Sequence, residues 1–154
     1  MSLAEFQTAV PPRHRCLGLD LGEKTIGLAL SDVLLTVATP YGVLDRAKFS
    51  INAEQLENIA TQEGAGGYVI GLPLNMDGSV GPSAQSARAF ARNLATRSEL
   101  PILLWDERLS TAAVQRDMIA ADVSRKRRAQ SVDKAAAAYI LQSALEAMRN
   151  LPPR

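Results

Sequence analysis

Apolar positions recur along this chain with two periods, one typical of strands and one typical of helices. Alternation, or a short apolar run bounded by Gly or Pro, predicts strands at residues 16–21, 26–31, 34–37, 41–44, 67–73 and 101–105. The pieces at 34–37 and 41–44 form one predicted strand that Pro40 interrupts. Apolar spacing of three and four residues predicts helices that begin near Asn52, Pro82, Ser110 and Ser131.

This order of elements predicts an α/β fold with a mixed five-stranded sheet flanked by helices. Residues 15–150 are expected to form a single domain, and residues 1–14 are expected to be a flexible N-terminal tail. In such sheets the working site lies beyond the carboxyl ends of the parallel strands. Asp20 ends the first predicted strand, and Asp106 and Glu107 end the last, so these acids are expected to be neighbours.

Composition narrows the chemistry that this chain can carry. The only cysteine is Cys16 and the only histidine is His14, so an intramolecular disulfide is excluded and a Cys/His zinc site is disfavoured. A metal would need oxygen ligands, which favours Mg²⁺ or Mn²⁺. The single cysteine fits a reducing cytoplasm, and no apolar run reaches the length of a signal peptide core or a membrane span.

Asp20 stands between two glycines on one face of the first strand. Gly18, Asp20 and Gly22 share that face, and Leu17, Leu19 and Leu21 share the other. Glycine in a strand often marks the close approach of a ligand or of another backbone. The pattern therefore fits a platform for a metal ion and a phosphate, and it fits equally a bulge and hairpin turn in which Asp20 is only capping or paired.

Two further acids complete the candidate set. Asp133 begins the last predicted helix, where an acid can simply complement the helix dipole, but the alanines after it would let that helix approach the sheet. Neighbours on a strand point to opposite sides, so only one of Asp106 and Glu107 can face the site. We assign Glu107 to the site and Asp106 to a supporting or capping role; pairing of both acids with Arg108 is the alternative.

Three carboxylates gathered from separate elements would repel one another unless cations neutralise them. A pair of divalent cations does this in two-metal phosphodiester chemistry, which needs no histidine as general base. We therefore predict Asp20, Glu107 and Asp133 as catalytic residues and as ligands of Mg²⁺ or Mn²⁺.

A basic run precedes Asp133 in a chain whose formal net charge is only +1. Arg125, Lys126, Arg127 and Arg128 could form a solvated loop or a patch that binds the phosphates of a nucleic acid without reading its sequence. Lys24, in the first turn, could reach a phosphate near Asp20. These five residues are the predicted nucleic-acid-binding set.

The motifs also resemble those of the bacterial YqgF/RuvX family. The resemblance covers roughly residues 15–147 and is carried, in order, by residues 18–32, 70–78, 105–111, 123–128 and 132–142. It implies an RNase H-like fold and a metal-dependent nuclease, either an endonuclease or an exonuclease, whose acids match Asp20, Glu107 and Asp133. The family is described both as a Holliday junction resolvase and as a nuclease that matures the 5′ end of pre-16S ribosomal RNA.

The resemblance favours processing of pre-16S rRNA in ribosome biogenesis, with resolution of four-way DNA as the alternative. The implied partners are pre-rRNA or branched DNA and the ribosomal small-subunit precursor, and the chain is expected to be a monomer or a weak homodimer. A nucleic-acid-binding assembly factor without catalysis remains a second class. An actin-like or sugar-kinase-type phosphotransferase is a third, although those folds need two such domains.

Overall fold

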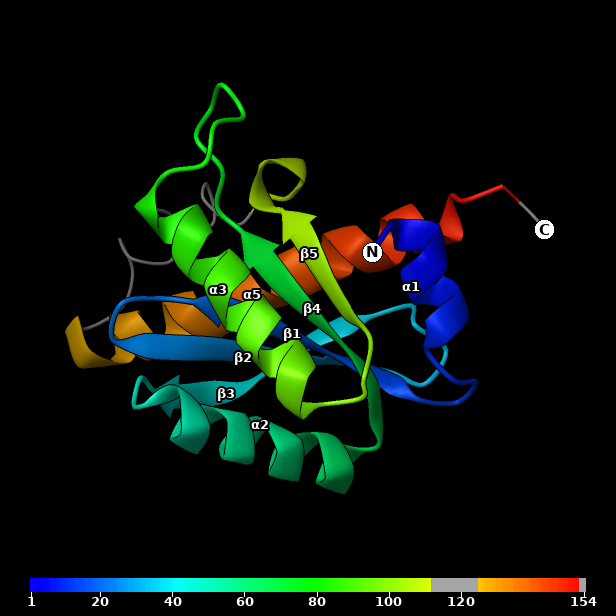
Figure 1. Cartoon of the computed structure of the whole chain (residues 1–154), viewed down its shortest axis with the longest axis horizontal. Coiled ribbons are helices and arrows are strands. Elements are labelled where there is room, and N and C mark those ends of the chain that lie inside the picture. The colour runs from blue at the N-terminus through cyan, green and yellow to red at the C-terminus, as the bar shows by residue number, and fades with distance from the viewer. Residues whose placement is uncertain (112–124, 153–154) are drawn as a thin grey trace.

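The computed structural model describes residues 1–111 and 125–152, and of residues 125–131 it describes the backbone alone. Five strands form one sheet in the order β3-β2-β1-β4-β5 (Figure 1). Their bounds are β1 Arg15–Leu21, β2 Thr25–Ser31, β3 Ala38–Asp45, β4 Ala65–Leu72 and β5 Ile102–Asp106. β1 is antiparallel to β2 and parallel to β4, β2 is antiparallel to β3, and β4 is parallel to β5. The predicted mixed sheet is confirmed.

Helices cover both faces of this sheet. They are α1 Leu3–Ala9, α2 Phe49–Glu63, α3 Pro82–Arg97 and α5 Arg125–Arg149, with a 3₁₀ turn, η1, at Glu107–Leu109. Figure 1 shows α2 and α3 on the near face and α5 behind the sheet. Most of the helix predicted after Ser110 lies outside the described residues. Within the described part of the chain, no helix has the length and apolarity needed to span a bilayer.

Alternation along β1 divides the core into two layers. Leu17 and Leu19 pack with α2 and α3, whereas Cys16 packs with α1 and α5 on the opposite face. Gly18 shares the face of Cys16, where a Cβ would be 2.9 Å from Cβ of Leu141 in α5. Gly18 therefore admits a helix rather than a ligand, and Asp20 is the one carboxylate that β1 directs to the α5 side.

The N-terminal segment differs from the flexible tail expected for residues 1–14. Ser2 and Glu5 form a capping box at the start of α1. Phe6 is fully buried and Val10 nearly so, and both belong to the core layer built around α5. The expectation was wrong because Phe6 in α1 and Val10, the C-cap residue just after it, both pack into the core.

Two predicted boundaries also move. The predicted strand piece at 34–37 is wrong, because Thr36 N and Val37 N donate to the Asp32 carboxylate in a turn. β3 runs from Ala38 to Asp45, and it passes through Pro40 because it is an edge strand whose outer side needs no ladder. α2 begins at Phe49 rather than near Asn52. The buried Asn52 side chain instead holds the preceding loop in place. Its amide oxygen accepts a hydrogen bond from Ala47 N, and its amide nitrogen donates to the carbonyl oxygen of Asp45.

Candidate active site

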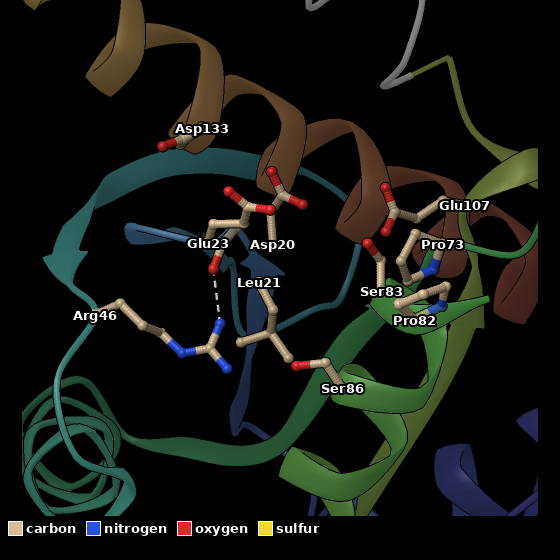
Figure 2. Close-up of a pocket in the computed structure, with 11 residues that line it drawn as sticks. Asp20, Leu21, Glu23, Arg46, Pro73, Pro82, Ser83, Ser86, Glu107 and Asp133 are labelled. Atoms are coloured by element: carbon tan, nitrogen blue, oxygen red, sulfur yellow. Dashed lines mark hydrogen bonds between the residues drawn. The ribbon is translucent and has the colours of Figure 1, made fainter.

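A cleft of about 670 Å³ opens at the carboxyl ends of the parallel strands. Its walls come from the β1–β2 hairpin, the segment after β3, the turn after β4, the start of α3, η1 and α5 (Figure 2). The lining residues are Asp20, Leu21, Gly22, Glu23, Arg46, Pro73, Pro82, Ser83, Ser86, Glu107 and Asp133. The cleft therefore brings together all three predicted acids.

Asp20 is the most deeply set of these acids. It lies near the end of β1, opposite Gly27 of β2, and is only 7% exposed. Burial of a carboxylate is unfavourable unless other groups compensate it, so few positions in a fold retain one. Pairing with β2 fixes the backbone of Asp20, which gives its carboxylate little freedom of position.

Glu107, rather than Asp106, enters the cleft. Asp106 caps η1 by accepting from Arg108 N at 2.9 Å, and it also accepts from the Arg108 guanidinium at 2.7 Å. These hydrogen bonds lower the pKa of Asp106 despite its partial burial. The Glu107 carboxylate lies over Gly71 of β4, where a Cβ would be 3.0 Å from Oε2. Gly71 thus leaves the space that this carboxylate occupies.

Asp133 comes from the interior of α5, not from its first turn. The helix begins at Arg125, about two turns earlier, so complementing the dipole does not explain this acid. The hydroxyl of Thr25 donates to the Asp133 carboxylate across the mouth of the hairpin. In Figure 2 Asp133 stands at the opposite side of Asp20 from Glu107.

The three acids share a cleft without meeting at one point. Among the residues that the structure describes, no three acidic, histidine or cysteine side chains are grouped tightly enough to hold a metal ion. The donor chemistry nevertheless fits a hard cation, because the cleft offers carboxylates from Asp20, Glu23, Glu107 and Asp133 and no histidine. Asp133 would have to exchange Thr25 for such a cation.

The structure describes the side chains of only part of the predicted nucleic-acid-binding set. Lys24 is exposed in the β1–β2 turn, and the cleft lining that the structure gives does not include it. The backbone of Arg125–Arg128 forms the start of α5 instead of the solvated loop considered above. The side chains of these four residues lie outside the described part of the chain, so their role stays a prediction.

Three residues that line the cleft were not predicted from the sequence, namely Arg46, Ser83 and Ser86. β3 pairs Asp45 with Thr25, so the residue after β3 arrives beside the hairpin mouth. Pro82 starts α3 at the opposite wall, and the two serines occupy its first turns. Only the sheet register brings these segments together, and no local motif indicates it.

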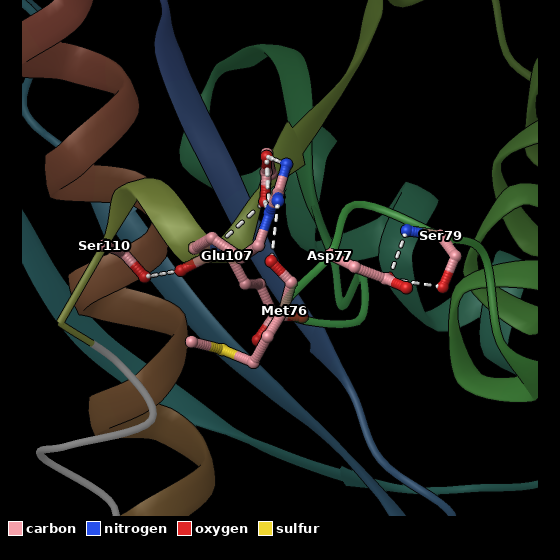
Figure 3. A network of polar contacts seen from close by, with 7 residues as sticks. Met76, Asp77, Ser79, Glu107 and Ser110 are labelled. Atoms are coloured by element: carbon pink, nitrogen blue, oxygen red, sulfur yellow. Dashed lines mark hydrogen bonds and ion pairs between the residues drawn. The ribbon is translucent and has the colours of Figure 1, made fainter.

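The loop between β4 and α3 is tied to η1 at the edge of the cleft (Figure 3). Arg108 donates to the carbonyl oxygen of Met76 at 3.3 Å while it pairs with Asp106. Within the loop, Asp77 accepts from both the backbone and the hydroxyl of Ser79. Arg108 therefore connects this loop to the segment that presents Glu107.

This chain is similar to known proteins over nearly its whole length. Residues 14–147 match the family described as "RuvX: Holliday junction resolvase". A protein of Rhodospirillum rubrum, named "Putative pre-16S rRNA nuclease", is 55% identical over 153 residues, which make up 99% of this chain and 95% of that protein.

Solved structures share the fold at low sequence identity. Thermus thermophilus RuvC, in complex with Holliday junction substrate, has a TM-score of 0.57 at 13% identity and covers 89% of this chain and 96% of that one. The yeast mitochondrial Holliday junction resolvase Ydc2 has a TM-score of 0.52 at 12% identity and covers 96% of this chain and 84% of that one. These likenesses confirm the RNase H-like fold that the family resemblance implied.

Proposed function

Because this chain belongs to the RuvX family of Holliday junction resolvases, we propose that it is a nuclease that hydrolyses phosphodiester bonds in structured nucleic acid. Its proposed substrate is the 5′ end of pre-16S rRNA within the ribosomal small-subunit precursor, in the cytoplasm. The name of the R. rubrum relative supports the RNA substrate. The description of the family supports a second candidate, the four-way DNA junction.

The observation that carries this proposal is one cleft lined by carboxylates from three separate elements. Asp20 comes from β1, Glu107 from η1 and Asp133 from α5. Keeping such acids together in a fold is unfavourable in itself, because like charges at close range raise the free energy of the ionised state. A function that requires them explains their presence better than the stability of the fold does.

We assign Asp20, Glu107 and Asp133 as the residues that would hold Mg²⁺ or Mn²⁺. When bound, such ions lower the pKa of water and stabilise charge on the leaving oxygen of a phosphodiester. Asp20 supplies a fixed carboxylate on the sheet. Glu107 is oriented by the capped turn η1 and by the space over Gly71. Thr25 holds the Asp133 carboxylate at the cleft, and Asp133 would exchange this hydrogen bond for the ion.

The test is cleavage of two substrates, an RNA spanning the 5′ leader of pre-16S rRNA and a four-way DNA junction, with Mg²⁺ or Mn²⁺ and with EDTA. We expect metal-dependent cleavage that falls by about a hundredfold or more in Asp20→Asn, as when other transition-state-stabilising groups are removed. Mapping the ends of the products distinguishes an endonuclease from an exonuclease.

The matched control is Asp32→Asn, which changes an aspartate outside the cleft. Asp32 accepts from Thr36 N at 2.7 Å and from Val37 N at 3.0 Å in the β2–β3 turn. This variant should cleave as the wild type does. Cleavage that survives Asp20→Asn would exclude the proposed mechanism. Binding without any cleavage by the pure wild type would favour the non-catalytic assembly factor.

A further inference from the structure

Arg46 is held in the cleft in a fixed orientation. Its guanidinium donates to the carbonyl oxygen of Gly22 at 2.7 Å, and its backbone N–H donates to the carbonyl oxygen of Lys24 at 2.8 Å. The guanidinium carbon also lies 5.6 Å from the ring centroid of Phe90, close enough for a cation–π contact. Two side-chain contacts therefore fix the guanidinium at the wall of the cleft, and one hydrogen bond fixes its backbone.

The charge of Arg46 is not used in an ion pair within the described part of the chain. Arg15, Arg97 and Arg108 each pair with a carboxylate, and Arg46 does not. It is the one basic side chain among the described residues that line the cleft. A guanidinium has five N–H donors, and the carbonyl oxygen of Gly22 takes only one of them.

Two hydroxyl groups line the cleft across from Arg46. Ser83 and Ser86 line the cleft from the first turns of α3, which is 16 residues long and whose N-cap, Gly81, offers no side chain. In the view of Figure 2, the guanidinium of Arg46 and the hydroxyl of Ser86 lie below the acidic side chains. Ser86 thus lies on the same side of the acids as Arg46, whereas Ser83 lies beside Glu107.

We propose that Arg46, with Ser86, binds a nucleic-acid backbone phosphate next to the scissile one. A guanidinium matches two phosphate oxygens with parallel N–H donors, and a fixed guanidinium loses little freedom on binding. The carboxylates would hold the metal ions that bind the scissile phosphate, while this subsite holds the neighbouring phosphate directly and sets the register of the strand. The inference rests on the proposed nuclease function, because it assigns a second subsite to the same cleft.

The test measures binding in EDTA, where cleavage plays no part. The probe is a fluorescently labelled single-stranded RNA of the pre-16S 5′ leader, titrated with protein at several salt concentrations. We expect Arg46→Ala to weaken binding by about tenfold, as the loss of a charged hydrogen bond does. The slope of log K against log salt should fall by about 0.7, because one fewer phosphate is neutralised.

The control variants test whether binding depends on a positive charge inside the cleft or on any positive charge of the protein. Arg97→Ala removes an exposed guanidinium that pairs with Glu57 at 2.5 Å, and it should leave both the slope and the affinity unchanged. Arg46→Lys keeps the charge and should keep the slope while losing affinity. Arg46→Gln retains a donor for the carbonyl oxygen of Gly22 and should lower the slope as Arg46→Ala does. A lower slope in both variants would show that the effect comes from the lost charge and not from a disturbed hairpin.

A second arm locates the phosphate. RNA–DNA chimeras with a single neutral methylphosphonate, moved along the strand, should show one position at which neutralisation weakens wild-type binding and no longer weakens binding by Arg46→Ala. The proposal is overturned if Arg46→Ala and Arg46→Gln keep the wild-type slope, or if no such position exists. If the subsite is confirmed but the wild type cleaves nothing in Mg²⁺ or Mn²⁺, the proposed nuclease function fails, and Arg46 is left as a phosphate contact for a bound strand that is not cleaved.

Discussion

The backbone of Asp133 in α5 lies directly against Gly27 in β2. A Cβ on Gly27 would be 2.1 Å from the carbonyl oxygen of Asp133. Real Cβ atoms do not approach an oxygen so closely, and a backbone carbonyl within a helix cannot turn aside. This contact fixes the height of α5 above the sheet at the residue that delivers its carboxylate to the cleft.

Gly27→Ala should therefore displace α5 and destabilise the fold by about 3 kcal/mol or more, the upper range for overpacked interiors. Gly42→Ala is the matched control, because Gly42 lies in the adjacent strand β3 and has no atom within 4 Å of its Cβ position. Urea unfolding measures both variants. Equal stability of the two would contradict the packing described here.

Gly71→Ala should affect cleavage more than folding. Its Cβ would be 3.0 Å from Oε2 of Glu107 and 2.8 Å from the terminal methyl group of Ile140, and both are ends of flexible side chains. The Glu107 carboxylate should move, and small displacements of a catalytic group cost up to about a hundredfold in rate. Cleavage assays and unfolding measured side by side provide the check; loss of stability equal to that of Gly27→Ala would refute this view.

Phe6→Ala tests whether the N-terminal helix belongs to the core. Phe6 is fully buried against the α5 layer, so truncation should cost about 3–5 kcal/mol in the free energy of unfolding. Leu3→Ala, at a residue only partly buried against the same layer, should cost less. A flexible tail would instead make Phe6→Ala neutral.

The ion pair of Asp106 with Arg108 should make stability depend on pH in the acid range. Hydrogen bonds from Arg108 lower the pKa of Asp106 below its ordinary value of 3.8, so the folded state favours the ionised carboxylate. This contribution is complete above about pH 5 and is lost as the pH falls through the lowered pKa. The stability gap between wild type and Asp106→Asn should shrink below pH 3.8, and urea unfolding at several pH values measures that gap.

Local patterns predicted the five strands and the mixed sheet. Alternation identifies a strand, so these features need no tertiary information. Alternation did not decide between Asp106 and Glu107, because Glu107 lies beyond the end of β5, in η1. The same rule could not say why Gly18 is a glycine. Its reason is the approach of Leu141, which is distant in sequence.

The helical conformation of the basic run could have been predicted from the sequence. Arg125, Lys126, Arg127 and Arg128 are good helix formers, so the basic run could have been assigned to the start of α5. Arg46 is different, because it reaches the cleft only through the pairing of β3 with β2. Pairing register and the length of the intervening turn decide that position, and neither carries a residue-level motif.

The sharing of divalent ions by Asp20, Glu107 and Asp133 is most directly tested by Mn²⁺ binding, followed by electron paramagnetic resonance. The account predicts two bound ions per chain, and binding weakened by about tenfold or more in Asp20→Asn, Glu107→Gln and Asp133→Asn, since even indirect metal partners contribute this much. Glu57→Gln, outside the cleft, should bind as the wild type does. Wild-type protein that binds no Mn²⁺, or three variants that bind it unchanged, would contradict the account.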